Sequence, residues 1–417
     1  MPLNEALLIH QLVGRFAGDA PKVIGVAVSG GGDSMALLHL MHRASAVAGW
    51  RVEAVTVDHC LRAEAADEAR MVAGFCAGIG VPHATLVWDH DEIAGNLMDR
   101  ARRARRALMA GWARQRGIGT VVLGHTADDQ AETLLMEMAR AAGLDGMSGM
   151  PSSWKEQGVL WSRPLLDQSR AHLREYLSGQ GIAWVDDPTN DDPAYSRVKA
   201  RRAMRALAPL GITAERLAAV ADHLTDAHRA LMWAIRQEAA RIVREEAGAL
   251  IIDKKAFVTL PGEFQRRLLI AALRWLSGAE QSPRGAKVGQ MHRALLQGKD
   301  ATLAGCRLRQ LPDHLLLVRE PRAVGGAVGA AVPEDALWDN RWRVEGPGGT
   351  GLHIATLGPE GLRQCPGWRA AGVSRDVLLV TPGVWRGDTL IAAPLAGKPD
   401  GWKARIVAGF QSFLVSH

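Results

Sequence analysis

Short apolar runs alternate with amphipathic stretches through the first third of the chain, and this alternation constrains the fold more than any other feature. The apolar, β-branched runs predict strands at residues 23–28, 52–57, 85–88 and 120–123. The stretches between them predict helices at residues 33–48, 63–78, 96–116 and 128–141. Elements in this order fold into an α/β, doubly wound parallel sheet, in which ligands bind at the carboxyl ends of the strands.

The rest of the chain has a different composition, and 417 residues are too many for one core. Residues 214–297 carry Ala, Leu and Arg at helical spacing, and 302–318 predict a hairpin that turns at Pro312. The Gly- and Ala-rich stretch 324–332 is typical of a linker, and alternating runs such as 342–344 and 377–380 predict strands after it. The predicted domains are an α/β domain at 1–210, a helical domain at 211–322 and a small α+β domain at 333–417.

Charge and cysteine content narrow the class of protein. The formal net charge of +6 favours a polyanionic partner, but only weakly. None of the four cysteines forms a C-x-x-C pair, which argues against a zinc ribbon, an iron–sulfur cluster or a dithiol redox site. The first 20 residues do not resemble a secretory signal, and no apolar stretch is long enough to span a membrane. We therefore expect a soluble, cytoplasmic protein with no membrane partner.

A glycine-rich loop follows the first predicted strand and precedes a helix. Glycines bring backbone N–H groups close to a ligand, and the helix N-terminus favours an anion. The loop matches neither the P-loop nor the dinucleotide pattern. Asp33 would repel a bare phosphate, which implies a bridging Mg²⁺ at this residue; the alternative is a plain turn with Asp33 as N-cap. The candidate phosphate ligands are Ser29, Gly30, Gly31, Gly32, Asp33 and Ser34.

Polar residues also follow the second and fourth strands. Asp58 and His59 lie where a base or ribose would sit, although a capping Asp beside a surface His is an equal alternative. After the fourth strand, His125, Asp129 and Glu132 could hold an amine and accept its proton. Alternatively, acids in the first turn of a helix need have no function, because the helix dipole favours negative charge there.

Three motifs together, SGGxDS, VDHxLR and GHxxDDQxET, resemble those of the tRNA(Ile)-lysidine synthetases, which are N-type ATP pyrophosphatases of the PP-loop superfamily. The stretches around Asn96, Arg163 and 181–190 strengthen the resemblance, which is close over the first 200 residues and looser beyond them. It implies that ATP adenylates the C2 oxygen of the wobble cytidine in tRNA(Ile) with a CAU anticodon. Free L-lysine then attacks C2, giving lysidine, AMP and pyrophosphate, with Mg²⁺ as a further cofactor.

The resemblance also implies roles for individual residues. Arg105 would stabilise charge at the reacting oxygen, while Asp129 and Glu132 would bind the lysine ammonium with His125 nearby. Two arginine-rich segments would contact tRNA phosphates, and a solvated basic surface is the alternative. The arginines predicted to contact tRNA are Arg102, Arg103, Arg106, Arg197 and Arg201.

Some positions depart from the family pattern, and some alternatives stay open. Gly32 replaces a bulkier residue, Cys60 replaces Gly, Arg106 replaces Tyr, and Ala141-Ala142 replaces Gly-Ser. A PP-loop tRNA thiolase, an amidotransferase-linked synthetase and a non-catalytic RNA-binding protein are the competing interpretations. The sequence leaves the oligomeric state, including a homodimer, open.

Overall fold

A computed structural model describes residues 4–18, 21–60, 64–89, 97–186, 196–279, 281–326, 328–329 and 337–416. The chain divides into two compact units, Met1–Arg229 and Ala230–His417. The division falls inside one helix, α9 (Ala214–Ile242). The domain limits predicted near residues 210 and 322 stay predictions.

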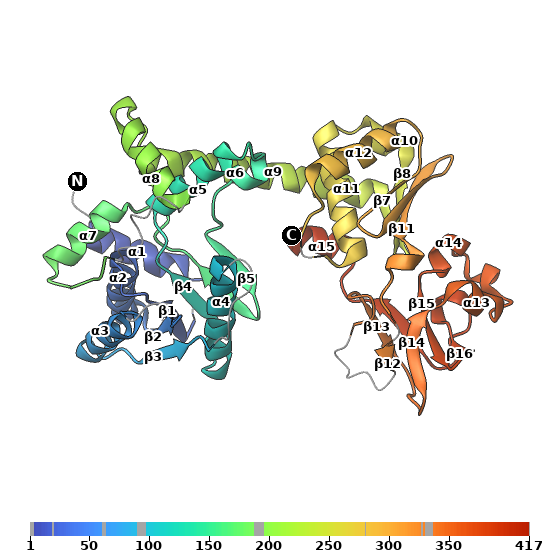
Figure 1. The fold of residues 1–417 in the computed structure, drawn as a ribbon, viewed down its shortest axis with the longest axis horizontal. Coiled ribbons are helices and arrows are strands. Elements are labelled where there is room, and N and C mark those ends of the chain that lie inside the picture. Colours follow the sequence, from blue (N-terminus) through green and yellow to red (C-terminus); the bar gives the residue numbers. More distant parts are fainter. Residues whose placement is uncertain are drawn as a thin grey trace. The chain divides into compact units, whose positions relative to one another are not determined.

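In the described part of the first unit, six strands form one sheet in the order β3-β2-β1-β4-β6-β5 (Figure 1). All neighbours pair in parallel except β5, which runs antiparallel to β6. The strands are β1 (Val23–Ala27), β2 (Arg51–Asp58), β3 (His83–Val87), β4 (Thr120–Leu123), β5 (Ser153–Glu156) and β6 (Val159–Ser162). The predicted parallel sheet is therefore confirmed, and the carboxyl end of β1 lies between those of β2 and β4.

Helices cover both faces of this sheet, because β1, β2 and β4 are apolar on both sides. On one face, Leu12, Leu37 and Leu177 pack over Ile24 of β1. On the other, Trp112 packs against Val121 of β4. The helices of this unit are α1 (Glu5–Arg15), α2 (Gly32–Ala48), α3 (Ala65–Gly78), α4 (Leu97–Gln115), α5 (Ala127–Ala139), α6 (Leu144–Met147), α7 (Arg170–Gly179) and α8 (Ser196–Leu207), with a 3₁₀ turn η2 (Ala208–Leu210).

The second unit begins with a mixed helix and sheet layer. Its antiparallel sheet has the order β7-β8-β11-β10-β9. The elements are β7 (Val243–Glu246), β8 (Ala249–Asp253), α10 (Lys254–Thr259), α11 (Gly262–Ser277), α12 (Gly285–Leu296), β9 (Ala301–Leu303), β10 (Cys306–Gln310) and β11 (His314–Arg319). The predicted hairpin at 302–318 is confirmed, but a turn at Ala304-Gly305 divides its first strand into β9 and β10, which pair with each other.

The C-terminal part of this unit is α+β, as predicted. In the described residues a sheet has the order β12-β14-β15-β16, and β13 pairs with β17. The elements are η3 (Pro321–Ala323), β12 (Val328–Gly329), β13 (Trp342–Glu345), β14 (Leu352–Thr356), α13 (Gly358–Arg363), η4 (Trp368–Ala371), α14 (Arg375–Leu378), β15 (Pro382–Arg386), β16 (Thr389–Ala392), η5 (Pro394–Ala396), β17 (Lys403–Ile406) and α15 (Phe410–Ser416).

One strand predicted in this part is wrong. Residues 377–380 lie in the short helix α14 and the turn after it. Ser374 has the extended conformation of an N-cap, and Asp376 occupies the first turn, where the helix dipole favours an acid. Val377 and Val380 are buried, and this burial accounts for the apolar residues that were interpreted as a strand.

Two hairpins, β5–β6 and β7–β8, were not predicted from the sequence. Their turns are Gln157-Gly158 and Ala247-Gly248, and all four residues have positive φ. Turns of this kind match the twist of a hairpin and are usually signalled by Asn-Gly or Asp-Gly. Gln and Ala give no such signal, and so β7–β8 was included in a stretch predicted to be helical.

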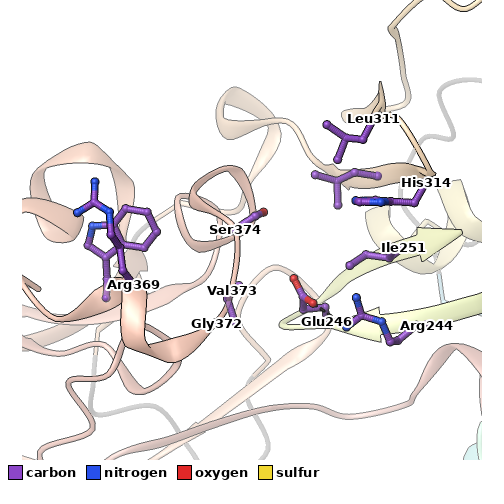
Figure 2. A pocket seen from close by; sticks show the side chains of 11 residues that line it. Arg244, Glu246, Ile251, Leu311, His314, Arg369, Gly372, Val373 and Ser374 are labelled. Carbon is purple, nitrogen blue, oxygen red and sulfur yellow. Dashed lines mark hydrogen bonds and ion pairs between the residues drawn. The ribbon is translucent and has the colours of Figure 1, made fainter.

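A cavity of about 380 Å³ opens in the second unit (Figure 2). Its lining includes Arg244, His314, Leu316, Trp368 and Arg369. None of the residues that line it belongs to the strand ends for which chemistry was predicted. Within the described residues, no helix is long and apolar enough to cross a membrane.

Candidate functional site

The glycine-rich loop connects β1 to α2 at the carboxyl edge of the parallel sheet. Gly30 has a φ of +84°, a conformation that a residue with a Cβ rarely adopts. Gly31 is the N-cap of α2 and supplies no side-chain hydrogen bond to the first turn. No side chain therefore caps the N–H groups of Gly32 and Asp33, which suits an anion, whereas the N–H of Ser34 donates to the carbonyl of Gly31 at 3.1 Å.

The two serines of the loop bind each other and the loop backbone. Ser34 Oγ donates to the carbonyl of Gly31 at 2.9 Å and accepts from the N–H of Ser29 at 3.1 Å. The Oγ atoms of Ser29 and Ser34 are 3.2 Å apart. Ser34 thus shapes the loop, and direct contacts of either hydroxyl with phosphate stay predictions.

Neighbouring segments press closely on this loop. A Cβ on Gly124, just after β4, would lie 2.9 Å from both the carbonyl oxygen of Asp33 and the Cα of Ser34. A Cβ on Gly32 would lie 3.4 Å from the ring of Trp184, so Gly32 packs against protein. Val185 donates its N–H to the carbonyl of Gly30 at 3.0 Å. The absence of a side chain at Gly124 is what allows β4 and the loop to meet.

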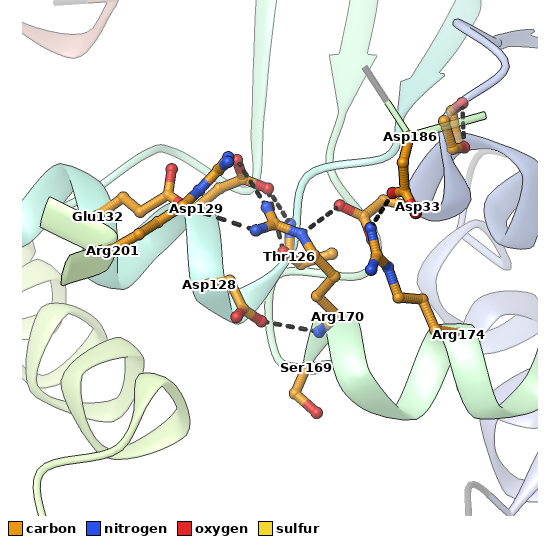
Figure 3. A network of polar contacts seen from close by, with 12 residues as sticks. Asp33, Thr126, Asp128, Asp129, Glu132, Ser169, Arg170, Arg174, Asp186 and Arg201 are labelled. Carbon is orange, nitrogen blue, oxygen red and sulfur yellow. Dashed lines mark hydrogen bonds and ion pairs between the residues drawn. The ribbon is translucent and has the colours of Figure 1, made fainter. Parts of the chain in front are cut away.

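Arg170, the first residue of α7, lies at the centre of an acidic cluster (Figure 3). Its Nε donates to Asp33 Oδ2 at 3.0 Å. Its Nη2 lies 3.6 Å from Asp129 Oδ1, and its Nη1 lies 3.5 Å from Glu132 Oε1. Its backbone N–H donates to Asp128 Oδ2 at 2.7 Å. This one arginine connects the phosphate loop to the predicted amine site on α5.

Asp129 and Glu132 are buried, and each has one oxygen held by the protein. Asp129 Oδ2 accepts from the N–H and the hydroxyl of Thr126, both at 3.0 Å, which caps α5. Glu132 Oε1 accepts from Arg201 Nε at 2.6 Å. The other oxygens, Asp129 Oδ1 and Glu132 Oε2, are each 4.0 Å from a nitrogen of Arg197. Glu132 Oε2 is buried, and the described residues offer it no hydrogen-bond donor.

Burial and charge act in opposite directions on the pKa values of these acids. Burial raises the pKa of Asp33 above its ordinary value, although Arg170 opposes the shift. Burial would also raise the pKa of Asp129, but Arg170, His125 and the Thr126 N–H together hold it below its ordinary value. Asp129 is therefore ionised at neutral pH.

His125 lies beside this cluster and pairs with Arg163 rather than with an acid. Arg163 Nε donates to His125 Nδ1 at 3.1 Å, and the guanidinium stacks over the Trp154 ring at 4.1 Å. Burial lowers the pKa of His125 to about 4, so the ring is neutral at pH 7 and its Nδ1 is an occupied acceptor.

The predicted basic residues fall into two groups. Arg102 and Arg103 are exposed on α4. Arg106 Nη1 donates to Glu156 Oε2 at 2.9 Å. Arg201 and Arg197 face the carboxylates of α5, as described above. Five RNA contacts were predicted, and the structure shows acidic partners of the same chain for three of them; all five stay predictions as RNA contacts.

Arg105 and the second strand end complete the predicted set. Arg105 Nε is buried without a hydrogen-bond partner among the described residues, and burial together with Arg102 lowers the pKa of Arg105. Asp58 Oδ1 accepts from the N–H of Cys60 at 2.8 Å, and the ring of His59 meets that of Trp88 edge-on at 5.8 Å. Asp58 therefore caps its own turn, and nucleotide contacts by Asp58 and His59 stay predictions.

Arg170 was not predicted as a site residue, and no role was predicted for Arg163 or Gly124, although both lie within the motifs. A weak signal for Arg170 was present: a cation in the first turn of a helix opposes the helix dipole, and acidic neighbours would offset this cost. Here Ser169 accepts from the N–H of His172 as N-cap, which marks the helix start.

Comparison with known proteins identifies the family of this chain. The family of the PP-loop domain matches residues 6–207. A tRNA(Ile)-lysidine synthase of Ruegeria pomeroyi is 42% identical over 409 residues, which cover 98% of this chain and 97% of that one. The chain belongs to the tRNA(Ile)-lysidine synthase family. Family members from Zymomonas mobilis (39% identical, covering 72% of this chain and 90% of that one) and Bradyrhizobium (40%, 73% and 86%) match as well.

Among solved structures, a U34-tRNA thiolase of Methanococcus maripaludis with a [4Fe-4S] cluster is similar at a TM-score of 0.47. It is 13% identical, and the match covers 53% of this chain and 78% of that one.

Two departures from the family pattern have a structural consequence: Cys60 and Ala141, which stand where the pattern has glycine, both have a φ of 52°.

Proposed function

We propose that this chain ligates L-lysine to C2 of the wobble cytidine of tRNA(Ile) with a CAU anticodon, consuming ATP and releasing AMP and pyrophosphate. The observation that carries the proposal is the convergence, around Arg170, of a phosphate loop and a buried carboxylate pair that retains two oxygens for a cation. The name that the relatives carry, tRNA(Ile)-lysidine synthase, supports this choice of substrates.

The loop supports the ATP half of the reaction. N–H groups at the start of α2 suit the polyphosphate. Asp33 Oδ1 is buried and has no hydrogen-bond partner among the described residues, which fits Mg²⁺ held by one carboxylate and phosphate oxygens. When bound there, Mg²⁺ would neutralise charge on the departing pyrophosphate. Arg105 would stabilise charge at the cytidine oxygen.

The carboxylate pair supports the lysine half. The ε-ammonium of lysine has an ordinary pKa of about 10.4 and must lose a proton before it attacks. Asp129 Oδ1 and Glu132 Oε2 can accept hydrogen bonds from that ammonium. Among the described residues, the nearest cationic nitrogen to Asp129 Oδ1 is Arg170 Nη2 at 3.6 Å, and Glu132 Oε2 has no hydrogen-bond donor. The neutral amine then forms a bond to C2, and AMP leaves with the former C2 oxygen.

One assay tests the whole proposal. The full chain is incubated with ATP, Mg²⁺, labelled L-lysine and unmodified tRNA(Ile) transcript, and label in the RNA and pyrophosphate are both measured. We expect both products only when all substrates are present. If the chain releases pyrophosphate with the transcript but never incorporates lysine, the proposed function is wrong.

Substitutions test the two halves separately. Asp33→Asn should lower turnover about a hundredfold or more, because it removes charge at the phosphate site. Glu132→Gln should raise the KM for lysine about tenfold or more with a smaller effect on the KM for ATP, because it removes one ammonium ligand. Glu53→Gln is the control, since Glu53 lies in the amino-terminal half of β2, where it pairs with Arg116; its kinetics should match those of the unaltered chain.

A further inference from the structure

Arg170 is bound by three acidic side chains that belong to two other elements. Its Nε, Nη1 and Nη2 each face a different carboxylate: Asp33 on α2, and Glu132 and Asp129 on α5. Only the contact with Asp33, at 3.0 Å, is a hydrogen bond of ordinary length; the other two are 3.5 and 3.6 Å. The guanidinium therefore binds the phosphate loop most tightly and the amine site more loosely.

The helix that carries Arg170 does not stabilise its charge. Arg170 is the first residue of α7, where the dipole of the helix disfavours a cation. Its side chain is only 20% exposed, so water compensates little of this cost. The acidic cluster holds the guanidinium in place, and a change in the charge of that cluster will move it.

Both substrates of the proposed reaction change that charge. Mg²⁺ would bind Asp33, the tightest partner of Arg170, and would repel the guanidinium. ATP would also bring phosphate oxygens to the adjoining loop, and a guanidinium binds phosphate in a bidentate manner. Lysine would bring an ammonium to Asp129 and Glu132, where it competes with Arg170 for the same acids.

We propose that Arg170 is a positioning residue that couples the two sites: without ATP it pairs with Asp33, Asp129 and Glu132, and when Mg²⁺ and ATP bind it turns to the phosphates and no longer competes with lysine for the α5 acids. This inference rests on the proposed function. Its consequence is ordered binding, with lysine held tightly only after ATP. Because coupling between two binding sites is reciprocal, lysine must strengthen ATP binding by the same factor.

The test measures binding rather than turnover. L-lysine is titrated calorimetrically into the full chain, alone and with Mg²⁺ and an ATP analogue that cannot be cleaved between the α- and β-phosphates. We expect the analogue to raise lysine affinity about tenfold or more in the unaltered chain. In Arg170→Gln, lysine should bind comparably with and without the analogue, and the reciprocal titration should show the same loss.

Two further variants make the result specific. Arg170→Lys keeps the charge but not the bidentate geometry, and it should retain only part of the coupling. Arg116→Gln removes an arginine that pairs with Glu53 at 2.7 Å, far from the carboxyl ends of the strands, and it should couple like the unaltered chain. Thermal unfolding of each variant checks that it folds.

The outcomes separate this inference from the proposed function. An unaltered chain that incorporates lysine into tRNA but binds lysine equally with and without the analogue would overturn the role of Arg170 and leave the function standing. So would Arg170→Gln with full coupling. If the unaltered chain neither binds nor incorporates lysine, the proposed function itself fails. Because the unaltered chain alone decides the first outcome, the test does not depend on the folding of a variant.

Discussion

At the scale of single residues, two side chains occupy backbone positions that suit glycine. Cys60 and Ala141 both have a φ of 52°, a region that costs a residue with a Cβ about 1–2 kcal/mol. The family resemblance predicts glycine at both positions. Side chains at these two positions therefore carry a cost in stability.

Replacing either residue with glycine should stabilise the chain. Relief of the strain exceeds the extra backbone entropy of glycine, so we expect Cys60→Gly and Ala141→Gly each to gain roughly 0.5–1 kcal/mol. Thermal unfolding measures the change. Ala227→Gly, at an exposed position inside α9, is the control and should lose about 1 kcal/mol. Equal losses at all three positions would contradict the argument.

The histidine beside the acidic cluster makes stability depend on pH. Burial lowers the pKa of His125 to about 4 from an ordinary value of 6.5. As pH falls through this window the unfolded chain takes up a proton that the folded chain does not, and the folded state is destabilised. His125→Asn lacks this contribution. The unfolding midpoint of the unaltered chain should therefore fall relative to that of the variant between pH 6.5 and pH 4. If the midpoints of the two proteins change with pH in parallel, the ring is not buried in its neutral form.

At the scale of elements, what the sequence predicts well is local. The strand before Ser29 and the helix after it follow from apolar periodicity and glycine content, which act within a few residues. Arg170 is 137 residues from Asp33, and no local pattern relates the two. Short elements are the other failure: α14 was interpreted as a strand because four residues cannot separate the two periodicities.

The meeting of β4 with the phosphate loop gives a prediction at this scale. Gly124→Ala would push a methyl group against the backbone of Asp33 and Ser34, so the loop must shift. We expect the KM for ATP to rise about tenfold or more, because the loop N–H groups lose their alignment. Gly119→Ala, at the opposite end of β4, places its Cβ in open space and is the control. If both variants bind ATP alike, the close approach does not shape the site.

At the scale of the whole molecule, the basic residues serve different purposes, because some of them pair with acids of the same chain. The net charge of +6 is small, and several arginines are paired with acids of the same chain. The exposed face of α4, which carries Arg102 and Arg103, stays a surface predicted to contact tRNA phosphates.

Salt dependence of tRNA binding tests the α4 surface. The double variant Arg102→Gln/Arg103→Gln should bind tRNA about tenfold more weakly, with a shallower dependence of log affinity on log salt, because fewer phosphate counterions are released. ATP binding should not change. Arg140→Gln, on a surface pair with Glu137, is the control and should keep the original slope. An unchanged slope in the double variant would exclude Arg102 and Arg103 from the interface.

The hydrogen bonds of Asp129 have a consequence for how this enzyme fails on heating. One oxygen of the carboxylate closes the first turn of α5, and the other faces the site proposed for lysine. A helix end frays before a domain unfolds. Warming should thus lower the affinity for lysine at temperatures at which the domain is still folded, because the end of this helix frays first.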